Sequence, residues 1–147
     1  MQITSRFTIA MHIITAIDYF KDEYAVTSKF LAGSIGANAV IIRNIMGELK
    51  EAGIISVSKG KSGIMLARPL DEISFYDVYK AVDSVSQDGL FKYHDNLNPD
   101  CPVARNIQTA MDGKLNRIQA AMEKELKKYT AEDDVKDTRD EIKKEKQ

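Results

Sequence analysis

The chain has 147 residues, 44% of them hydrophobic, which is enough for one compact domain with an appended segment. It contains no run of about 18 apolar residues, no pattern of a secretory signal and a single cysteine, so we expect a cytoplasmic protein without a membrane span or an internal disulfide. The formal net charge is −1, but residues 1–70 carry eight Lys and Arg against five Asp and Glu, a weak sign of nucleic-acid binding.

The first predicted element is a helix that begins at Thr4 or Ser5 and ends near Lys21. Its apolar residues recur at spacings of three and four, which is the period of one helix face. A short second helix is predicted to follow, because Thr27 or Ser28 can accept hydrogen bonds from the free N–H groups of a first helical turn. It is predicted to end near residue 35.

A third helix is predicted over residues 39–52, with Asn38 as its N-cap and Gly53 as its C-terminal stop. Gly36 provides a tight turn between the second and third helices. Two helices joined by a tight glycine-containing turn are the pattern of a helix-turn-helix.

A β-hairpin is predicted directly after the third helix. Residues 54–58 are β-branched and alternating, residues 59–63 form a turn, and residues 64–67 are apolar again. Ser74 then caps a fourth helix, so that residues 1–82 form a winged helix-turn-helix DNA-binding domain with a two-stranded wing. The predicted fold class is therefore mostly α.

The second half of the chain is predicted to hold a long helix between two polar segments. Residues 83–101 are turn-rich and are interpreted as a linker and possible effector loop. Pro102 suits the first position of a helix, and apolar residues at spacings of three and four continue to Tyr129. Residues 131–147 carry mixed charges and few apolar side chains, so they are predicted to be disordered or a frayed, solvated helix.

Residues 102–130 are interpreted as a dimerisation helix. Such a helix spans roughly 40 Å at about 1.5 Å per residue, and its apolar stripe is too long for the small preceding domain to cover. The same helix from a second copy is the simplest partner, which predicts a two-fold homodimer and a palindromic DNA site. The alternative is that the stripe folds back onto its own domain.

A helical wheel divides the predicted third helix into two faces. The face expected to pack in the core consists of Ile41, Ile42, Ile45, Met46, Leu49 and Ala52. The opposite face consists of Ala39, Val40, Arg43, Asn44, Gly47 and Lys50. A core requires the first face, and a DNA recognition helix requires side chains like those of the second.

The second face carries side chains that can recognise bases. Arg43 can donate two hydrogen bonds to a guanine edge, Asn44 can pair with adenine, and Val40 can touch a thymine methyl group. Near the first helix, Ser5 or Arg6 can contact phosphate. The full set of expected DNA contacts is Ser5, Arg6, Asn38, Ala39, Val40, Arg43, Asn44, Lys50, Lys59 and Lys61.

On an isolated helix, Arg43 and Lys50 would be interpreted as solvated surface residues. Here their face follows a short capped helix and precedes a hairpin whose tip carries Lys59 and Lys61. This arrangement is typical of a winged helix, which places one helix in the major groove and its wing over the backbone or minor groove. We therefore favour binding to double-stranded DNA.

The segment from residue 45 to residue 68 has a specific order: Leu49, then Ala52-Gly53, a serine, a glycine-rich turn, and finally Leu66-Ala67-Arg68. In this order it resembles the Rrf-two family of winged-helix regulators. Residues 5–10 and 71–78 are similar to the family as well, and the resemblance covers roughly residues 3–130. It implies a dimeric transcription regulator, usually a repressor, of genes for cysteine, iron–sulfur, redox or nitrogen-oxide metabolism.

Two departures from the family pattern matter. Family members that bind an iron–sulfur cluster carry three cysteines between the fourth helix and the long helix, whereas this chain has only Cys101. Such clusters need four protein ligands, mostly thiolates, so we expect no cofactor and a cluster-free subgroup. In addition, Lys59 stands in place of the family's wing arginine, and a lysine ammonium suits phosphate contact better than groove readout.

Cys101 and the lack of catalytic motifs define the remaining alternatives. Cys101 is either a small residue near a helix start or a redox-sensing thiol beside the positive helix end. His12, His94 and Cys101 match no metal-ligand spacing, and no nucleophile–base pair or phosphate-binding loop is evident, so no enzyme is predicted. The alternatives to a DNA-binding regulator are a thiol-based redox sensor and a winged-helix module that binds only protein.

Overall fold

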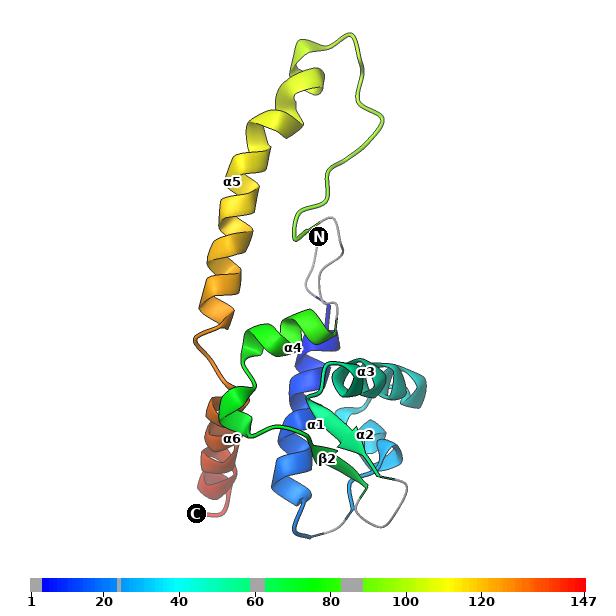
Figure 1. The fold of residues 1–147 in the computed structure, drawn as a ribbon, viewed down its shortest axis with the longest axis vertical. Coiled ribbons are helices and arrows are strands. Elements are labelled where there is room, and N and C mark those ends of the chain that lie inside the picture. Colours follow the sequence, from blue (N-terminus) through cyan, green and yellow to red (C-terminus); the bar gives the residue numbers. More distant parts are fainter. Residues whose placement is uncertain (1–3, 24, 59–62, 83–88) are drawn as a thin grey trace.

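The computed structural model describes residues 4–23, 25–58, 63–82 and 89–147 and is mostly helical, with one long helix projecting from a compact domain (Figure 1). In chain order its elements are α1 (Arg6–Phe20), α2 (Ser28–Ile35), α3 (Ala39–Glu51), β1 (Ile55–Val57), β2 (Ile64–Leu66), the 3-10 helix η1 (Leu70–Glu72), α4 (Phe75–Ala81), α5 (Pro102–Leu126) and α6 (Ala131–Glu145). The predicted winged helix-turn-helix with a two-stranded wing is confirmed.

Helix α1 forms the centre of the core. Its Ile13, Ile14 and Ile17 side chains are almost completely buried, because α2, α3, α4, β2 and α6 all pack around this helix. Burying one such side chain contributes about 1.5–3 kcal/mol, so α1 is the main apolar anchor of the domain.

The predicted boundaries of α2 and α3 are confirmed by their caps. The Thr27 hydroxyl accepts a hydrogen bond from the backbone N–H of Phe30, and the Asn38 side chain accepts one from the N–H of Val40 at 2.7 Å. Between the two helices, Gly36 adopts a φ of +75°, a conformation that side chains with a Cβ rarely take.

Helix α5 projects from the domain, and no residue within its bounds is buried. Its C-terminal end packs against α4. Residues 89–101 run beside α5 from Gln119 to its N-terminal end, and the backbone N–H of Leu90 donates to the Gln119 side chain at 2.8 Å. In the part of the chain that is described, no single helix is long and apolar enough to cross a membrane; α2 and α3 meet that criterion only as a pair bent by 115°.

The prediction that residues 131–147 are disordered or a frayed, solvated helix was wrong. This segment forms α6, which packs against α1 and buries Ala131 and Val135 (Figure 1). Its start is fixed by a capping box, in which Thr130 accepts from the N–H of Asp133 and the Asp133 carboxylate accepts from the N–H of Thr130. From composition alone, the charged residues of this segment are expected to be solvated. In the structure, charged side chains instead cap α6 and hold it against the domain.

The start of α6 is also joined to the start of α4. Ser74 and Thr130 form an antiparallel β-bridge, the N–H of Phe75 donates to the carbonyl of Tyr129 at 2.8 Å, and the N–H of Ala131 donates to the carbonyl of Ile73 at 2.7 Å. These bonds fasten the chain immediately after α5 to the winged-helix domain.

An ion pair holds the middle of α6 against α1. Arg139 donates to the carboxylate of Asp18, a buried residue of α1, at 2.9 Å, and Lys21 contacts the same carboxylate at 3.1 Å. Burial acts to raise the pKa of Asp18, but the hydrogen bonds from Arg139 and Lys21 outweigh it and hold the pKa below its usual 3.8. The ionised form of Asp18 is therefore favoured by folding.

Replacing Arg139 by alanine should lower the free energy of unfolding by about 1–3 kcal/mol at neutral pH, because a buried carboxylate loses a charged hydrogen-bond donor. Since the folded-state pKa of Asp18 is depressed, this contribution is present above pH 3.8 and is lost as the pH falls through that lower pKa. Urea unfolding of Arg139→Ala and of the exposed control Lys136→Ala measures both effects. Equal stability of the two variants at neutral pH would contradict this role.

Candidate nucleic-acid interface

Helix α3 presents one face to the core and one face to solvent. On the inner side Ile42, Ile45 and Leu49 are fully buried. On the outer side the exposed residues are Val40, Arg43, Asn44, Gly47 and Lys50, as the helical wheel predicts. Among the described residues, the side chains of Arg43 and Lys50 form no ion pair, so their charges are available to a partner.

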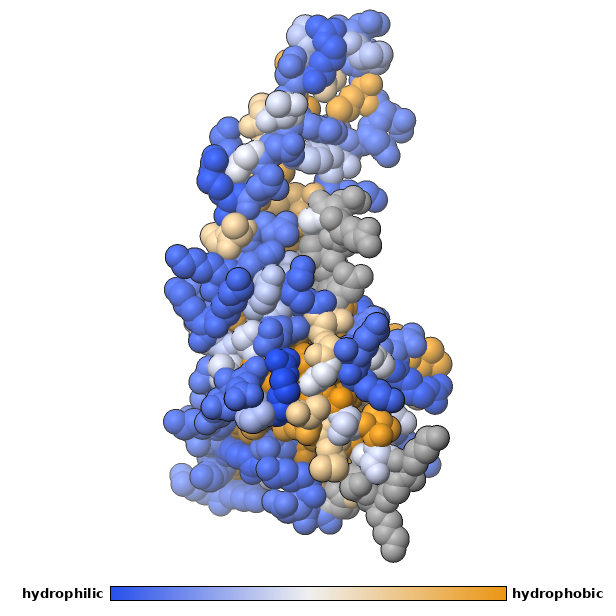
Figure 2. Space-filling model, viewed as in Figure 1, coloured by the Kyte–Doolittle hydropathy of each residue, from blue (hydrophilic) through white to orange (hydrophobic). Residues whose placement is uncertain are grey.

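The predicted inner face is wrong at its two edges. Ile41 is 41% exposed and Ala52 is exposed, whereas Ala39, assigned to the outer face, is half-buried. At about 100° per residue, Ile41 and Ala52 lie well to one side of the arc centred on Ile42, Ile45 and Leu49, beyond the reach of the core. Figure 2 shows apolar surface at the end of α3 that projects from the domain.

Sequence reasoning left one acidic residue of this surface unassigned. Glu51 is exposed and lies eleven residues, about three turns, after Val40, so both residues share the outer face. Glu51 is the last residue of α3, so a negative charge lies beside Lys50 at the end of this face. At the helix start the free N–H groups attract anions, and Asn38, whose carbonyl oxygen caps Val40, keeps its amide N–H₂ for a further bond.

The structure places Arg6 in an intramolecular contact. Its guanidinium lies 2.5 Å from the Glu48 carboxylate of α3, and its Nε donates to the carbonyl of Val82, which follows α4, at 3.2 Å. The Glu48 oxygen is buried and has no aligned hydrogen-bond donor among the described residues, so the attraction is ionic. Arg6 thus braces α3 against the end of α4, while its neighbour Ser5 is exposed.

The wing is an antiparallel pair in which Ile55 faces Leu66, Ser56 faces Met65 and Val57 faces Ile64. It is anchored at Gly63, where φ is +64° and an added Cβ would lie 2.6 Å from the carbonyl oxygen of Val26. The next residue, Ile64, donates its N–H to that same oxygen at 3.1 Å. The predicted contacts Lys59 and Lys61 lie outside the described residues.

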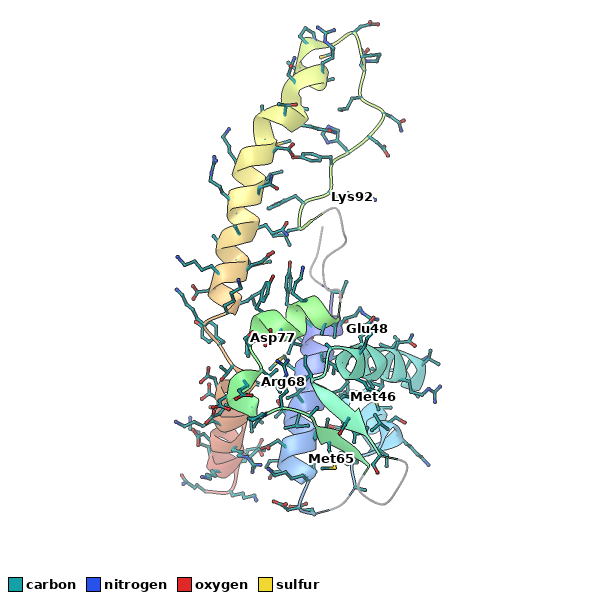
Figure 3. The ribbon with its side chains drawn as sticks, viewed as in Figure 1. Met46, Glu48, Met65, Arg68, Asp77 and Lys92 are labelled. Atoms are coloured by element: carbon teal, nitrogen blue, oxygen red, sulfur yellow. The ribbon has the colours of Figure 1, made fainter. Side chains whose placement is uncertain are left out.

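A second ion pair holds the chain after the wing. Arg68 lies 3.8 Å from the carboxylate of Asp77 in α4, and Figure 3 shows the two side chains beside one another below α4. Asp77 also completes the α4 capping box with Ser74. The wing, α4 and the joint to α6 are therefore tied together.

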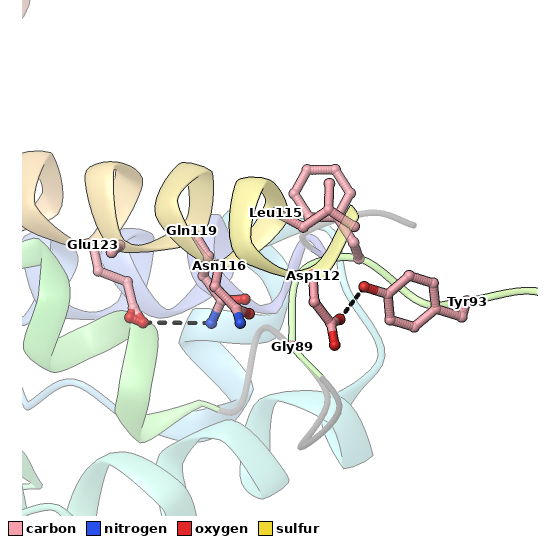
Figure 4. Close-up of a pocket in the computed structure, with 9 residues that line it drawn as sticks. Gly89, Tyr93, Asp112, Leu115, Asn116, Gln119 and Glu123 are labelled. Carbon is pink, nitrogen blue, oxygen red and sulfur yellow. Dashed lines mark hydrogen bonds between the residues drawn. The ribbon is translucent and has the colours of Figure 1, made fainter. Parts of the chain in front are cut away.

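The predicted effector loop borders a cavity of about 350 Å³ against α5 (Figure 4). Its walls include Gly89, Phe91 and Leu115, and the Tyr93 hydroxyl donates to the Asp112 carboxylate. This hydrogen bond raises the pKa of Tyr93. Residues 83–88 of the loop are outside the described part of the chain.

Comparison with known proteins decides the family. The family model of Rrf2 (Rrf-two), described as an iron-dependent transcriptional regulator, matches residues 3–137. This chain belongs to the Rrf2 family. It is also 37% identical over 131 residues, 89% of this chain and 95% of the relative, to YwnA of Bacillus subtilis, which is assigned as an HTH-type transcriptional regulator. These relatives of the Rrf2 chain are transcriptional regulators rather than enzymes.

Solved structures share the fold of this Rrf2 protein. A crystal structure of a protein assigned to DNA binding has a TM-score of 0.67 and 31% identity, covering 88% of this chain and 97% of that one. A protein from Lactobacillus plantarum, assigned as a transcriptional regulator, has a TM-score of 0.74 and 25% identity, covering 92% and 90%. CymR of B. subtilis has a TM-score of 0.66, 15% identity and coverage of 92% and 97%.

The residues of this Rrf2 protein do not fit an iron–sulfur cluster. Such a cluster needs about four protein ligands, mostly thiolates, whereas the chain has one cysteine, so two copies together supply two thiolates. Cys101 is half-buried at the N-cap of α5. Elsewhere in the described ranges, no three His, Cys, Asp or Glu side chains converge as metal ligands.

Changing Gly63 to alanine should destabilise the wing by more than about 1 kcal/mol, because alanine is strained at a positive φ and its Cβ meets the Val26 carbonyl. Gly47 offers a matched control: it lies in α3 with open space around it, so Gly47→Ala should stabilise the helix by up to about 1 kcal/mol. Thermal unfolding of both variants checks the contrast. Similar melting temperatures would show that the Gly63 conformation carries no cost.

Proposed function

We propose that this Rrf2 protein is a sequence-specific DNA-binding repressor that acts as a homodimer on a palindromic operator. The observation that carries the proposal is the division of α3, whose buried Ile42, Ile45 and Leu49 fix its orientation while its cationic outer face stays exposed. A dimer seated over a promoter would exclude the polymerase, and this is the mode of repression that we propose.

In this proposal α3 enters the major groove and supplies the base contacts. Arg43 donates to a guanine edge, Asn44 pairs with adenine, and Val40, which is 53% exposed, meets a thymine methyl group. Gly47 lets the helix approach the duplex closely. Phosphate contacts are assigned to Ser5, Asn38, the backbone at Ala39, Lys50, Lys59 and Lys61. Arg6 does not contact DNA in this proposal; it stabilises the position of α3 through its ion pair with Glu48.

The similarity to a structure assigned to DNA binding, at 31% identity, supports this use of the fold. The HTH-type assignment of YwnA, at 37% identity, supports it as well. A winged-helix module that binds only protein would have no need for a cationic outer face on its third helix.

The proposed dimer is formed by α5. This helix of 25 residues spans about 37 Å, yet its Val103 and Ile118 remain 68% and 52% exposed. A second copy of α5, related by a two-fold axis, would cover this stripe. Two recognition helices on one face of the duplex would then contact half-sites about 34 Å apart, which is the geometry of a palindrome.

Substituting Arg43 by alanine should weaken operator binding by about 1–3 kcal/mol and relax the preference at one base pair of each half-site. Operators for the test come from selection of genomic fragments that the wild-type protein retains, and binding is measured by fluorescence anisotropy over a range of salt. Lys136→Ala, on the exposed side of α6, is the control and should leave affinity unchanged. An equal loss on operator and unrelated DNA would assign Arg43 to phosphate instead.

Introducing a charge with Ile118→Glu should convert the dimer to a monomer at micromolar concentration, because the carboxylate would be buried without a partner. Operator affinity should fall with it, since one half-site alone supplies half of the contacts. Lys124→Glu, which lies about a third of a turn from Ile118 on the same helix, is the matched control. Analytical ultracentrifugation checks both; an unchanged mass for Ile118→Glu would rule out this interface.

A further inference from the structure

A groove beside α1 is formed by parts of the protein that lie far apart in the sequence. Its walls come from α1, from Ser34 in α2, from Phe75 in α4 and from Asp134, Thr138 and Ile142 in α6, and its volume is about 500 Å³. Figure 1 shows α1 between α2 and α6. Small-molecule sites typically enclose about 300–1,000 Å³. The groove is separate from the outer face of α3 and from the exposed stripe of α5.

The groove is aromatic on its apolar side. Phe7, Tyr19, Phe20 and Phe75 line it together with Met11. Phe7 and Phe75 meet edge to face with centroids 5.8 Å apart, which fixes two of the rings in place. Walls of this kind suit a planar aromatic ligand, because ring edges and faces make favourable contacts with another ring.

The polar side of the groove favours a ligand that donates a hydrogen bond. Asp134 is half-buried, and its Oδ2 accepts from the Thr15 hydroxyl at 2.9 Å. Among the described residues no cation pairs with this carboxylate, and its Oδ1 keeps an open acceptor position. The Nε2 atom of His12 and the hydroxyl oxygen of Ser34 lie 3.0 Å apart and add further polar groups to the groove. An anionic ligand would be repelled by Asp134, whereas a phenol or an aromatic amine would satisfy it.

We infer that the groove between α1 and α6 binds a planar aromatic compound carrying a phenolic or amino donor, with the ring against Phe7 and Phe75 and the donor on Asp134. Because the ligand would touch both α1 and α4 of the winged-helix domain and α6, it would sit across the joint between this domain and the helix that follows α5. A role as effector site rests on the proposed function, whereas the binding itself does not.

The test uses the full chain without DNA and two probes, 2-naphthol and 2-methoxynaphthalene, which share the same rings but differ in the donor. In equilibrium dialysis, 2-naphthol should bind saturably with one molecule per chain and at least about tenfold more tightly than 2-methoxynaphthalene, since a hydrogen bond to a carboxylate is worth a factor of this size. Asp134→Leu should reduce the ratio to about one. Asp137→Leu, on the exposed side of α6, should preserve it.

A second pair of variants tests the location independently of Asp134. Thr138→Trp should fill the groove and abolish binding of both probes, and Asp137→Trp should leave both affinities unchanged. Non-saturable binding, equal affinity for the two probes, or an unaltered ratio in Asp134→Leu would overturn the inference. So would a folded Thr138→Trp variant that becomes monomeric in the ultracentrifuge, because the groove would then belong to an interface between two copies. Loss of operator binding in Arg43→Ala has no bearing on these outcomes.

Discussion

The packing of α3 against α1 is the constraint on which the proposed DNA contacts depend. Ile42, Ile45 and Leu49 are completely buried against the core that α1 organises, and truncating one such side chain typically costs about 2–5 kcal/mol. This helix therefore cannot rotate about its axis, and the side that carries Arg43 and Asn44 must face outward. A hydrophobic contact inside the domain thus decides which polar side chains a partner can meet.

A second constraint acts where α5 leaves the domain. The β-bridge between Ser74 and Thr130 holds the start of α6, and the ion pair between Asp18 and Arg139 holds its middle. The direction of α5 is therefore set by several bonds rather than by one flexible turn. In a two-fold dimer built on α5, the separation of the two recognition helices would follow from this joint. The preferred spacing of the two DNA half-sites would then be determined by α4 and α6 as well as by α3.

Interactions between neighbouring residues made most of the fold predictable from the sequence. Pairs between residues far apart in the chain were not predictable. The caps at Thr27 and Asn38 and the glycine at position 36 act on neighbouring residues, so the sequence predicts the helix-turn-helix closely. Arg139 instead docks on Asp18, 121 positions away, and nothing near either residue indicates the pair. The same limit applies to Arg6, whose guanidinium, predicted to contact phosphate, pairs with Glu48 on another helix.

The single cysteine has a consequence for how a signal can act on this Rrf2 protein. A ligand shifts an equilibrium only through a difference in its binding free energy between two states. For a ligand other than a cluster, that difference comes from contacts with side chains that move relative to each other. In the α1–α6 groove such side chains would be Ser34 of the helix-turn-helix and Asp134 of the helix that follows α5. A compound that fits only one arrangement of these two residues would favour one spacing of the recognition helices.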